Sequence, residues 1–97
     1  MDRARILGML AERQREIAAR YGVKRLAVFG SAARDELAPG SDLDVLVDFT
    51  GPATFNAYMD LKFFLEDLLG RPVDLVTGKS LRRELRPYVE KEMIRVA

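Results

Sequence analysis

Three short apolar runs, each bounded by glycine or proline, constrain the fold of this chain most strongly. They span residues 25–30, 42–49 and 73–76, and longer segments with apolar residues at helical spacing precede, separate and follow them. Short runs between turn signals are typical of buried β-strands, and the longer segments are typical of amphipathic helices. The pattern predicts an α/β fold in the order α-β-α-β-α-β-α, with a small sheet packed by helices.

The helical segments have recognisable ends. The first, with apolar residues from Ile6 to Tyr21, is predicted to be one helix that stops at Gly22. A short helix is expected from Ala32 to about Leu37. A long helix follows Gly51-Pro52 and ends at Gly70, and a last one starts at Pro87. The aromatic residues of the long helix are interpreted as core and not as a platform for a nucleotide base; they are Phe55, Tyr58, Phe63 and Phe64.

Length and composition exclude several kinds of chemistry. A chain of 97 residues has room for one core, so residues 1–97 are expected to form a single domain. The absence of Cys and His excludes disulfides, Cys/His zinc sites, thiol nucleophiles and imidazole catalysis. No apolar run is long enough to span a membrane, and we expect a cytoplasmic protein. Any reaction must therefore use carboxylates, hydroxyls and cations.

The charges are unevenly placed along the chain, although the net charge is only +1. Lys and Arg against Asp and Glu number seven to three in residues 1–25, three to nine in residues 26–78, and six to three in residues 79–97. The near-zero net charge argues against a nucleic-acid partner, whereas an acidic middle suits a divalent cation. The basic flanks suit an anionic substrate or an acidic partner, or are simply solvated helix faces. Small size and exposed strand edges also favour a homodimer.

Asp42 and Asp44 are the clearest chemical signal. Residues two apart on a strand point to the same face, so this spacing brings two carboxylates together beside the Gly40-Ser41 turn. Their repulsion is relieved by a cation, and hard oxygen ligands select Mg²⁺ or Mn²⁺. A solvated pair at a strand edge is the structural alternative. Asp48 shares their strand parity but lies too far along to reach the same metal, and is interpreted as structural.

Asp74 lies within the apolar run from Val73 to Val76, where an isolated ionised carboxylate would be costly to bury. If the third strand lies beside the second, Asp74 joins Asp42 and Asp44 as a third ligand. The three carboxylates would then suit a site for two metal ions. The alternative is a residue that caps a turn or pairs with an Arg.

Gly30 and Ser31 lie between a predicted strand and a predicted short helix. Glycine allows close backbone approach, and free backbone N–H groups at such a turn suit a phosphate. The Ser31 hydroxyl and the Arg34 guanidinium, one turn later, add donors. Ser41, beside the carboxylate pair, is a further candidate for nucleotide binding. The alternative is an ordinary turn.

Together, the motifs resemble those of the nucleotidyltransferase superfamily that includes DNA polymerase β. They are Phe29-Gly30-Ser31-Ala32-Ala33-Arg34, Gly40-Ser41-Asp42-Leu43-Asp44-Val45-Leu46-Val47 and Val73-Asp74-Leu75-Val76. Three elements in this order are far more specific than any one of them. The likeness runs from about Leu26 to Val76, and the small size resembles the minimal nucleotidyltransferases, commonly encoded beside a helical HEPN-domain protein.

The resemblance implies a mixed sheet, two Mg²⁺ ions bound to the nucleotide's triphosphate, and roles for individual residues. Asp42 and Asp44 match the metal-binding pair, and Asp74 matches the carboxylate near the acceptor hydroxyl. Gly30 and Ser31 match the turn that holds the triphosphate, and Arg34 matches an Arg common in the minimal group. Asp35 departs from the pattern, because many relatives have glycine there, which leaves the local loop conformation open.

The predicted function is Mg²⁺-dependent transfer of a nucleoside monophosphate, AMP from ATP by default among the NTPs, onto a hydroxyl. The resemblance implies that the acceptor is a Tyr of a HEPN-type toxin, which makes this chain an antitoxin. Two alternatives remain. The chain is a non-catalytic antitoxin that binds its partner, or it is the catalytic half of a two-chain transferase for a small molecule.

Overall fold

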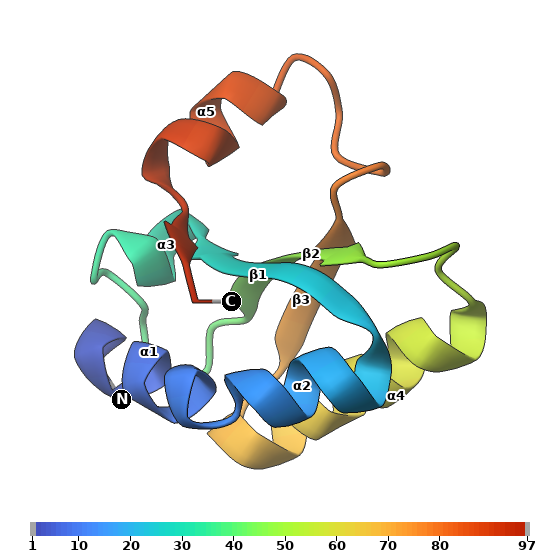
Figure 1. Cartoon of the computed structure of the whole chain (residues 1–97). Helices are drawn as coiled ribbons and strands as arrows, with labels where there is room; N and C mark the ends of the chain where they lie inside the picture. The colour runs from blue at the N-terminus through green and yellow to red at the C-terminus, as the bar shows by residue number, and fades with distance from the viewer. Residues whose placement is uncertain (1, 97) are drawn as a thin grey trace.

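Figure 1 shows the fold of the chain as a computed structural model, which describes residues 2–96. The elements follow the chain as α1 (Arg3–Glu12), α2 (Gln14–Tyr21), β1 (Val23–Phe29), α3 (Gly30–Ala33), β2 (Leu43–Phe49), α4 (Phe55–Leu69), β3 (Val73–Thr77), α5 (Arg86–Glu92) and β4 (Ile94–Arg95). The predicted α/β class and the three predicted strands are confirmed.

The strands form one mixed sheet in the order β3-β2-β1-β4. Strand β1 runs antiparallel to both of its neighbours, β2 and β4, whereas β2 and β3 are parallel. The crossover helix α4, which joins β2 to β3, is what allows two successive strands to run in the same direction. Because β3 lies beside β2, the condition set by the sequence analysis is met, and the segments that carry Asp44 and Asp74 are neighbours.

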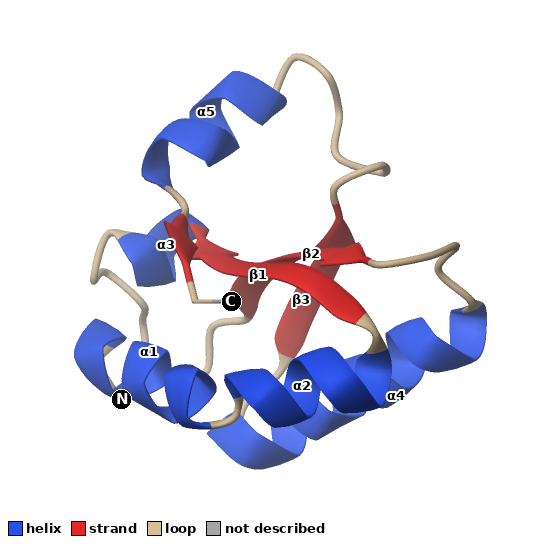
Figure 2. Cartoon of the chain, viewed as in Figure 1, coloured by secondary structure: helices blue, strands red, loops and turns tan. Residues whose placement is uncertain are grey.

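Helices cover the two faces of the sheet unequally. Figure 2 shows α1, α2 and α4 on one side of the sheet and α5 on the other. The main core lies on the first side, where alternate strand residues pack against the helices; its fully buried members include Leu10, Ile17, Leu26, Val28, Leu43, Val45, Val47, Leu61 and Leu65. On the α5 side, Ala27, Leu46 and Val89 form a smaller cluster.

Glycine and proline end and begin the helices where the sequence predicts. Gly22 and Gly70 adopt left-handed backbone conformations, with φ of 65° and 67°, at the ends of α2 and α4. This conformation is unfavourable for residues with a Cβ atom, so glycine is the natural stop. Pro87 lies in the first turn of α5, where its missing N–H is not needed.

Four local predictions are wrong. The first helix is two helices, with a break at Arg13. The short helix ends at Ala33 and not near Leu37, and the fourth strand, β4, was not expected. Of the four aromatic residues on α4, Tyr58 and Phe64 pack against the core, but Phe55 and Phe63 are exposed. Within residues 2–96, no helix is long and apolar enough to cross a membrane.

Candidate active site

Asp44 and Asp74 are direct neighbours on the sheet. They are paired in the parallel register of β2 and β3, and Phe29 of β1 is paired with Asp44 on its other side. Residues paired in this way share a face of the sheet, and Asp44 and Leu46 share one face of β2 because they are two apart. The two carboxylates therefore lie on the α5 side, next to the smaller cluster.

Asp42 and Asp74 are both exposed, and Asp44 is half-buried. The prediction that Asp74 is a costly buried carboxylate is therefore wrong, because the alternating pleat turns its side chain to the surface while Val73 and Leu75 point into the core. Asp42 comes just before β2 begins at Leu43. Solvent can therefore reach the carboxylates of Asp42 and Asp74, whereas Asp44 is the least exposed of the three.

The electrostatics of Asp44 reflect this position. Partial burial raises the pKa of the Asp44 carboxyl above its ordinary value, and the charge of neighbouring Asp74 and a hydrogen bond with it raise the pKa further. Asp42 adds to this effect, whereas the Arg34 guanidinium opposes it. Burial is the main cause of the raised pKa, and a bound cation would relieve the part that comes from the two other carboxylates.

The donor set fits a divalent metal ion that is shared with a bound nucleotide. Among the described residues, no three His, Cys, Asp or Glu side chains are grouped so that they alone could hold a metal ion. Mg²⁺ is usually bound by one or two carboxylates, with phosphate oxygens and water completing the shell. The adjacent pair Asp44 and Asp74, with Asp42 nearby, matches that mode of binding and not an all-protein cage.

Gly30 begins the turn that follows β1, and it approaches Asp44 closely. Its φ is +67°, and a Cβ atom added there would collide with Asp44 Oδ2. Both observations favour glycine, because another residue would strain the backbone and push the Asp44 carboxylate out of place. The fold therefore brings the predicted phosphate turn directly against Asp44, one of the predicted metal ligands.

The other predicted nucleotide-binding residues surround this turn. Ser31 is half-buried, and its hydroxyl neither caps α3 nor bonds any described residue. Arg34 follows α3, with Nε 3.4 Å from Glu36 Oε2 and Nη1 2.8 Å from Glu92 Oε2. Ser41 lies one residue before Asp42, and its backbone N–H donates to the Ala38 carbonyl. The structure brings Gly30, Ser31 and Arg34 together, while Ser41 lies on the loop that leads to the carboxylates.

Asp35, the residue that departs from the pattern of the resemblance, adopts a left-handed backbone conformation. Its φ is 60°, and it is the only non-glycine among the described residues with a positive φ. The Arg3 backbone N–H donates to Asp35 Oδ1 at 3.0 Å, and Arg3 Nη1 donates to the Ala33 carbonyl at 2.9 Å. Asp tolerates the left-handed region better than most residues, and these hydrogen bonds hold the loop in this conformation.

Asp48, at the far end of β2, has a structural partner, as predicted. Its Oδ2 accepts a hydrogen bond from Arg25 Nε at 2.7 Å in a half-buried ion pair.

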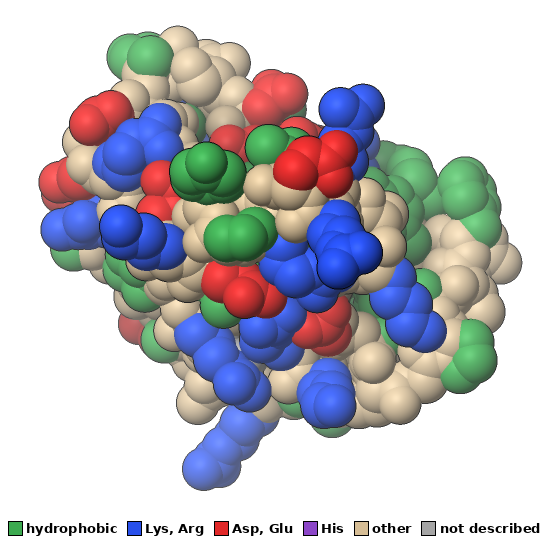
Figure 3. Space-filling model, turned by 90° about the horizontal axis from the view of Figure 1, so that it is seen from above, with side chains coloured by type: hydrophobic (Ala, Val, Ile, Leu, Met, Phe, Trp, Pro, Cys, Tyr) green, Lys and Arg blue, Asp and Glu red, His purple; other side chains and the backbone are tan. Residues whose placement is uncertain are grey.

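Two hollows lie elsewhere: one of about 650 Å³ beside α2 and α4, and one of about 240 Å³ beside Asp48. Neither is lined by Asp42, Asp44 or Asp74. Seen from the α5 side in Figure 3, acidic and basic side chains are interleaved across the molecule.

Glu92 is the residue of this region that sequence reasoning missed. It lies at the end of α5, and its carboxylate accepts hydrogen bonds from the Gly30 backbone and from Arg34. Nothing in the local sequence singles it out, because it is one of several charged residues on a short helix. Only the pairing of β4 with β1 brings it to the turn.

Comparisons with known proteins give both a family match and close relatives. Residues 11–96 match the model of a family described as a nucleotidyltransferase domain. The protein adenylyltransferase MntA of Thermococcus cleftensis is 37% identical over 91 residues, which cover 94% of this chain and 92% of that protein.

Solved structures share the fold. A candidate minimal nucleotidyltransferase is 42% identical, with a TM-score of 0.76 over 91% of this chain and 93% of that one. An antitoxin in complex with a tri-AMPylated HEPN toxin from Shewanella oneidensis is 18% identical, with a TM-score of 0.67 over 94% of this chain and 71% of that one. At that identity the second likeness supports the fold alone.

Proposed function

This chain belongs to the nucleotidyltransferase domain family, and we propose that it transfers AMP from ATP to a hydroxyl group of a partner protein. The observation that carries the proposal is the pairing of Asp44 with Asp74 directly beside the Gly30 turn. This arrangement offers ligands for a metal–triphosphate next to donors for its phosphates. A relative named protein adenylyltransferase, 37% identical over most of both chains, supports a protein as the acceptor.

Divalent cations, Mg²⁺ or Mn²⁺, would be held by Asp42, Asp44 and Asp74. The carboxylate oxygens are hard ligands. Partial burial raises the pKa of Asp44 most, and the neighbouring charges of Asp74 and Asp42, which a cation would offset, raise it further. We propose two ions, in line with the resemblance. When bound, they neutralise phosphate charge and lower the pKa of the acceptor hydroxyl.

The triphosphate would be held by the turn from Gly30 to Arg34. The Ser31 hydroxyl has no partner among the described residues and is available to donate to a phosphate oxygen. Arg34 provides the positive charge, and Ser41 lies beside the carboxylates. Charge-assisted hydrogen bonds of this kind would hold the β- and γ-phosphates and so orient the α-phosphorus. Orientation is a large part of the catalysis of phosphoryl transfer.

The reaction forms one bond and breaks one bond at the α-phosphorus of ATP. The acceptor oxygen bonds to this phosphorus while the bond to the bridging oxygen of the β-phosphate breaks, and pyrophosphate leaves. The hydroxyl proton passes to a base, and we assign this role to Asp74, which matches the carboxylate near the acceptor and is exposed. No imidazole is needed.

The acceptor would be a Tyr hydroxyl of a HEPN-type toxin, which the transfer of AMP silences. This chain would then act as an antitoxin in the cytoplasm. One solved structure with this fold is an antitoxin bound to a tri-AMPylated HEPN toxin, and we propose a partner of that kind here. The exposed position of Asp74 also suits an acceptor delivered from outside the chain.

The test is transfer of labelled α-phosphate from ATP to the protein encoded beside this chain, in the presence of Mg²⁺. We expect label that stays attached through denaturation and that maps to Tyr. Asp74→Asn should suppress labelling while ATP binding is largely kept, because a carboxylate near the acceptor acts mainly in the transition state. Asp60→Asn, an exposed carboxylate on α4, is the matched control. Neutralisation of the partner by binding without any label would favour the non-catalytic alternative.

A further inference from the structure

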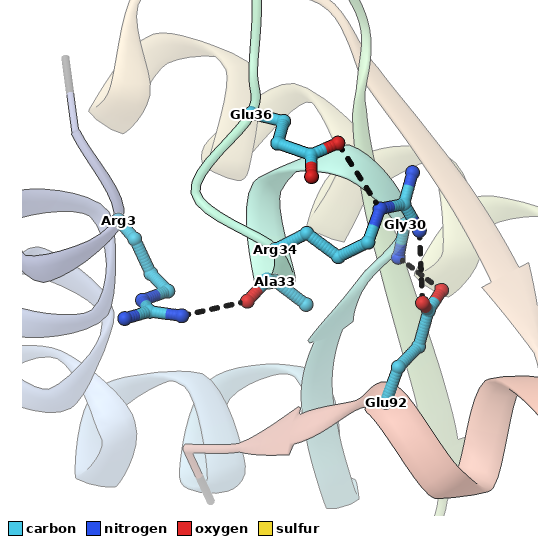
Figure 4. Close-up of polar contacts among 6 residues, drawn as sticks. All are labelled: Arg3, Gly30, Ala33, Arg34, Glu36 and Glu92. Atoms are coloured by element: carbon cyan, nitrogen blue, oxygen red, sulfur yellow. Dashed lines mark hydrogen bonds and ion pairs between the residues drawn. The ribbon is translucent and has the colours of Figure 1, made fainter.

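Glu92 joins the C-terminal part of the chain to the predicted triphosphate turn. Its Oε1 accepts the Gly30 backbone N–H at 3.1 Å, and its Oε2 accepts a hydrogen bond from Arg34 Nη1 at 2.8 Å (Figure 4). One carboxylate therefore contacts the first residue of the turn and the cation that follows it. Glu92 is half-buried at the last position of α5, so its own position is fixed by the helix.

The Glu92 carboxylate contacts Gly30 from the β4 side of β1, whereas Asp44 lies on the β2 side. In the sheet order, β1 lies between β2, which carries Asp44, and β4, which follows Glu92. Val28 is paired with Ile94, so Gly30 and Glu92 both lie two residues beyond the last pair of β1 and β4. Glu92 accordingly contacts the β4 side of the turn, and the opposite side remains toward the carboxylates that would hold the metal.

The contact also fixes the orientation of Arg34. Hydrogen bonds to Glu92, and secondarily to Glu36, raise the pKa of the Arg34 guanidinium. These bonds use Nη1 and Nε, whereas Nη2 bonds no described residue. A guanidinium has five N–H groups, so donors remain for a phosphate. An Arg held in place before binding loses less side-chain entropy when a phosphate arrives.

We propose that Glu92 is a positioning residue for the triphosphate, acting through Gly30 and Arg34. The inference rests on the proposed function, because it assumes that the turn and Arg34 hold the β- and γ-phosphates. A rival reading is that Glu92 competes with the triphosphate for these donors. The approach from the β4 side and the remaining Nη2 donors favour positioning.

Binding of Mg·ATP and of AMP by calorimetry tests the proposal. Glu92→Gln keeps the size of the side chain and an acceptor for Gly30 but removes the charge that holds Arg34. We expect ATP affinity to fall about threefold to tenfold and AMP affinity to stay within about twofold. Glu90→Gln, an exposed residue of the same helix, should change neither affinity. If Glu92→Gln unfolds the chain, Glu92→Asp, which retains the charge with a shorter reach, should give the same loss for ATP alone.

A double-mutant cycle with Arg34→Gln separates failure of this inference from failure of the proposed function. We expect Arg34→Gln to weaken ATP binding and the double variant to lose little more, because both changes remove the same interaction. Unchanged ATP affinity in Arg34→Gln would overturn the proposed role of Arg34, and the inference with it. Weaker binding in Arg34→Gln but not in Glu92→Gln, or additive losses, would overturn the inference alone. Tighter ATP binding, or equal losses for ATP and AMP, in Glu92→Gln would also overturn it.

Discussion

The two faces of the sheet differ in the side chains that they carry and in how deeply these are buried. On the face covered by α1, α2 and α4, the inward strand side chains are apolar and buried. On the α5 face, a small apolar cluster lies between the Asp44 and Asp74 carboxylates at one end and the Arg25–Asp48 ion pair at the other. A chain this small can leave one face thinly covered because the other supplies most of the apolar burial. Under the proposed function, stability and chemistry are therefore separated by the thickness of one sheet.

The largest test of this separation is Asp42→Asn combined with Asp44→Asn. If the α5 face carries the chemistry, AMP transfer should fall at least about a hundredfold and Mg·ATP binding should be lost, while the fold is retained. Calorimetry and circular dichroism measure the two properties. Asp60→Asn with Asp67→Asn, two exposed carboxylates of α4, is the control that should keep both. Unaltered binding of Mg·ATP by the first variant would show that the metal site is elsewhere.

A matched pair of valines tests the separation from the stability side. Val47 is fully buried on the helix-covered face, and Val76 is half-buried on the α5 face. Val47→Ala should lower the free energy of unfolding by about 2 kcal/mol, and Val76→Ala by about 1 kcal/mol or less. Urea denaturation measures both. Equal costs would show that the α5 face contributes as much to stability as the main core.

Ser31→Ala should have a smaller effect, confined to binding. We expect ATP affinity to weaken by about 1 kcal/mol with the free energy of unfolding nearly unchanged, because the hydroxyl bonds no described residue. Gly30→Ala should differ in kind and damage the turn itself, since φ is +67° and the added Cβ would meet Asp44 Oδ2. Calorimetry and thermal unfolding distinguish the two variants. Parent-like ATP affinity in Ser31→Ala would leave this hydroxyl without a role in binding.

The smallest expected effect is a pH dependence of stability in the absence of divalent cations. The raised pKa of Asp44 means that the folded chain binds this proton more tightly than the unfolded chain does. Stability should therefore fall as pH rises from the ordinary pKa of 3.8 through the raised value, and Asp44→Asn should remove this slope. Denaturation at several pH values with a chelator present measures it. A slope that is equal in parent and variant would assign the effect to another group.

Sequence reasoning succeeded where the signal is local. Strand parity placed Asp42 and Asp44 on one face, and Gly22 marks a helix end through its own backbone preference. That Asp74 joins them was predicted only on the condition that β3 lies beside β2, which the structure meets. The break at Arg13 was missed because the apolar spacing on both sides of it is helical. The positions between Leu10 and Ile17 that would face the core in one long helix include Arg13, and the break turns this residue outward.

The rest of the site depends on contacts between distant parts of the chain. Strand β4 has two residues, too few to show alternation, and Glu92 reaches Gly30 only because β4 pairs with β1. The exposure of Asp74 follows from its parity on β3 and not from the apolar composition around it. The residues adjacent in the sequence indicate neither the contact of Glu92 with Gly30 nor the exposure of Asp74.

The turn after β1 also has consequences for the order of folding. Its hydrogen bonds reach 62 positions forward, from Gly30 to Glu92, and 32 positions back, from Asp35 to Arg3. Contacts between such distant residues close large loops, so they form after local helices and after the β1–β2 hairpin. The turn therefore gains its final conformation only when α1 and α5 have docked. In reverse, local opening of α5 should release the Gly30 amide to hydrogen exchange while the amides of β1 stay protected, so that competence for nucleotide binding is lost before the fold is.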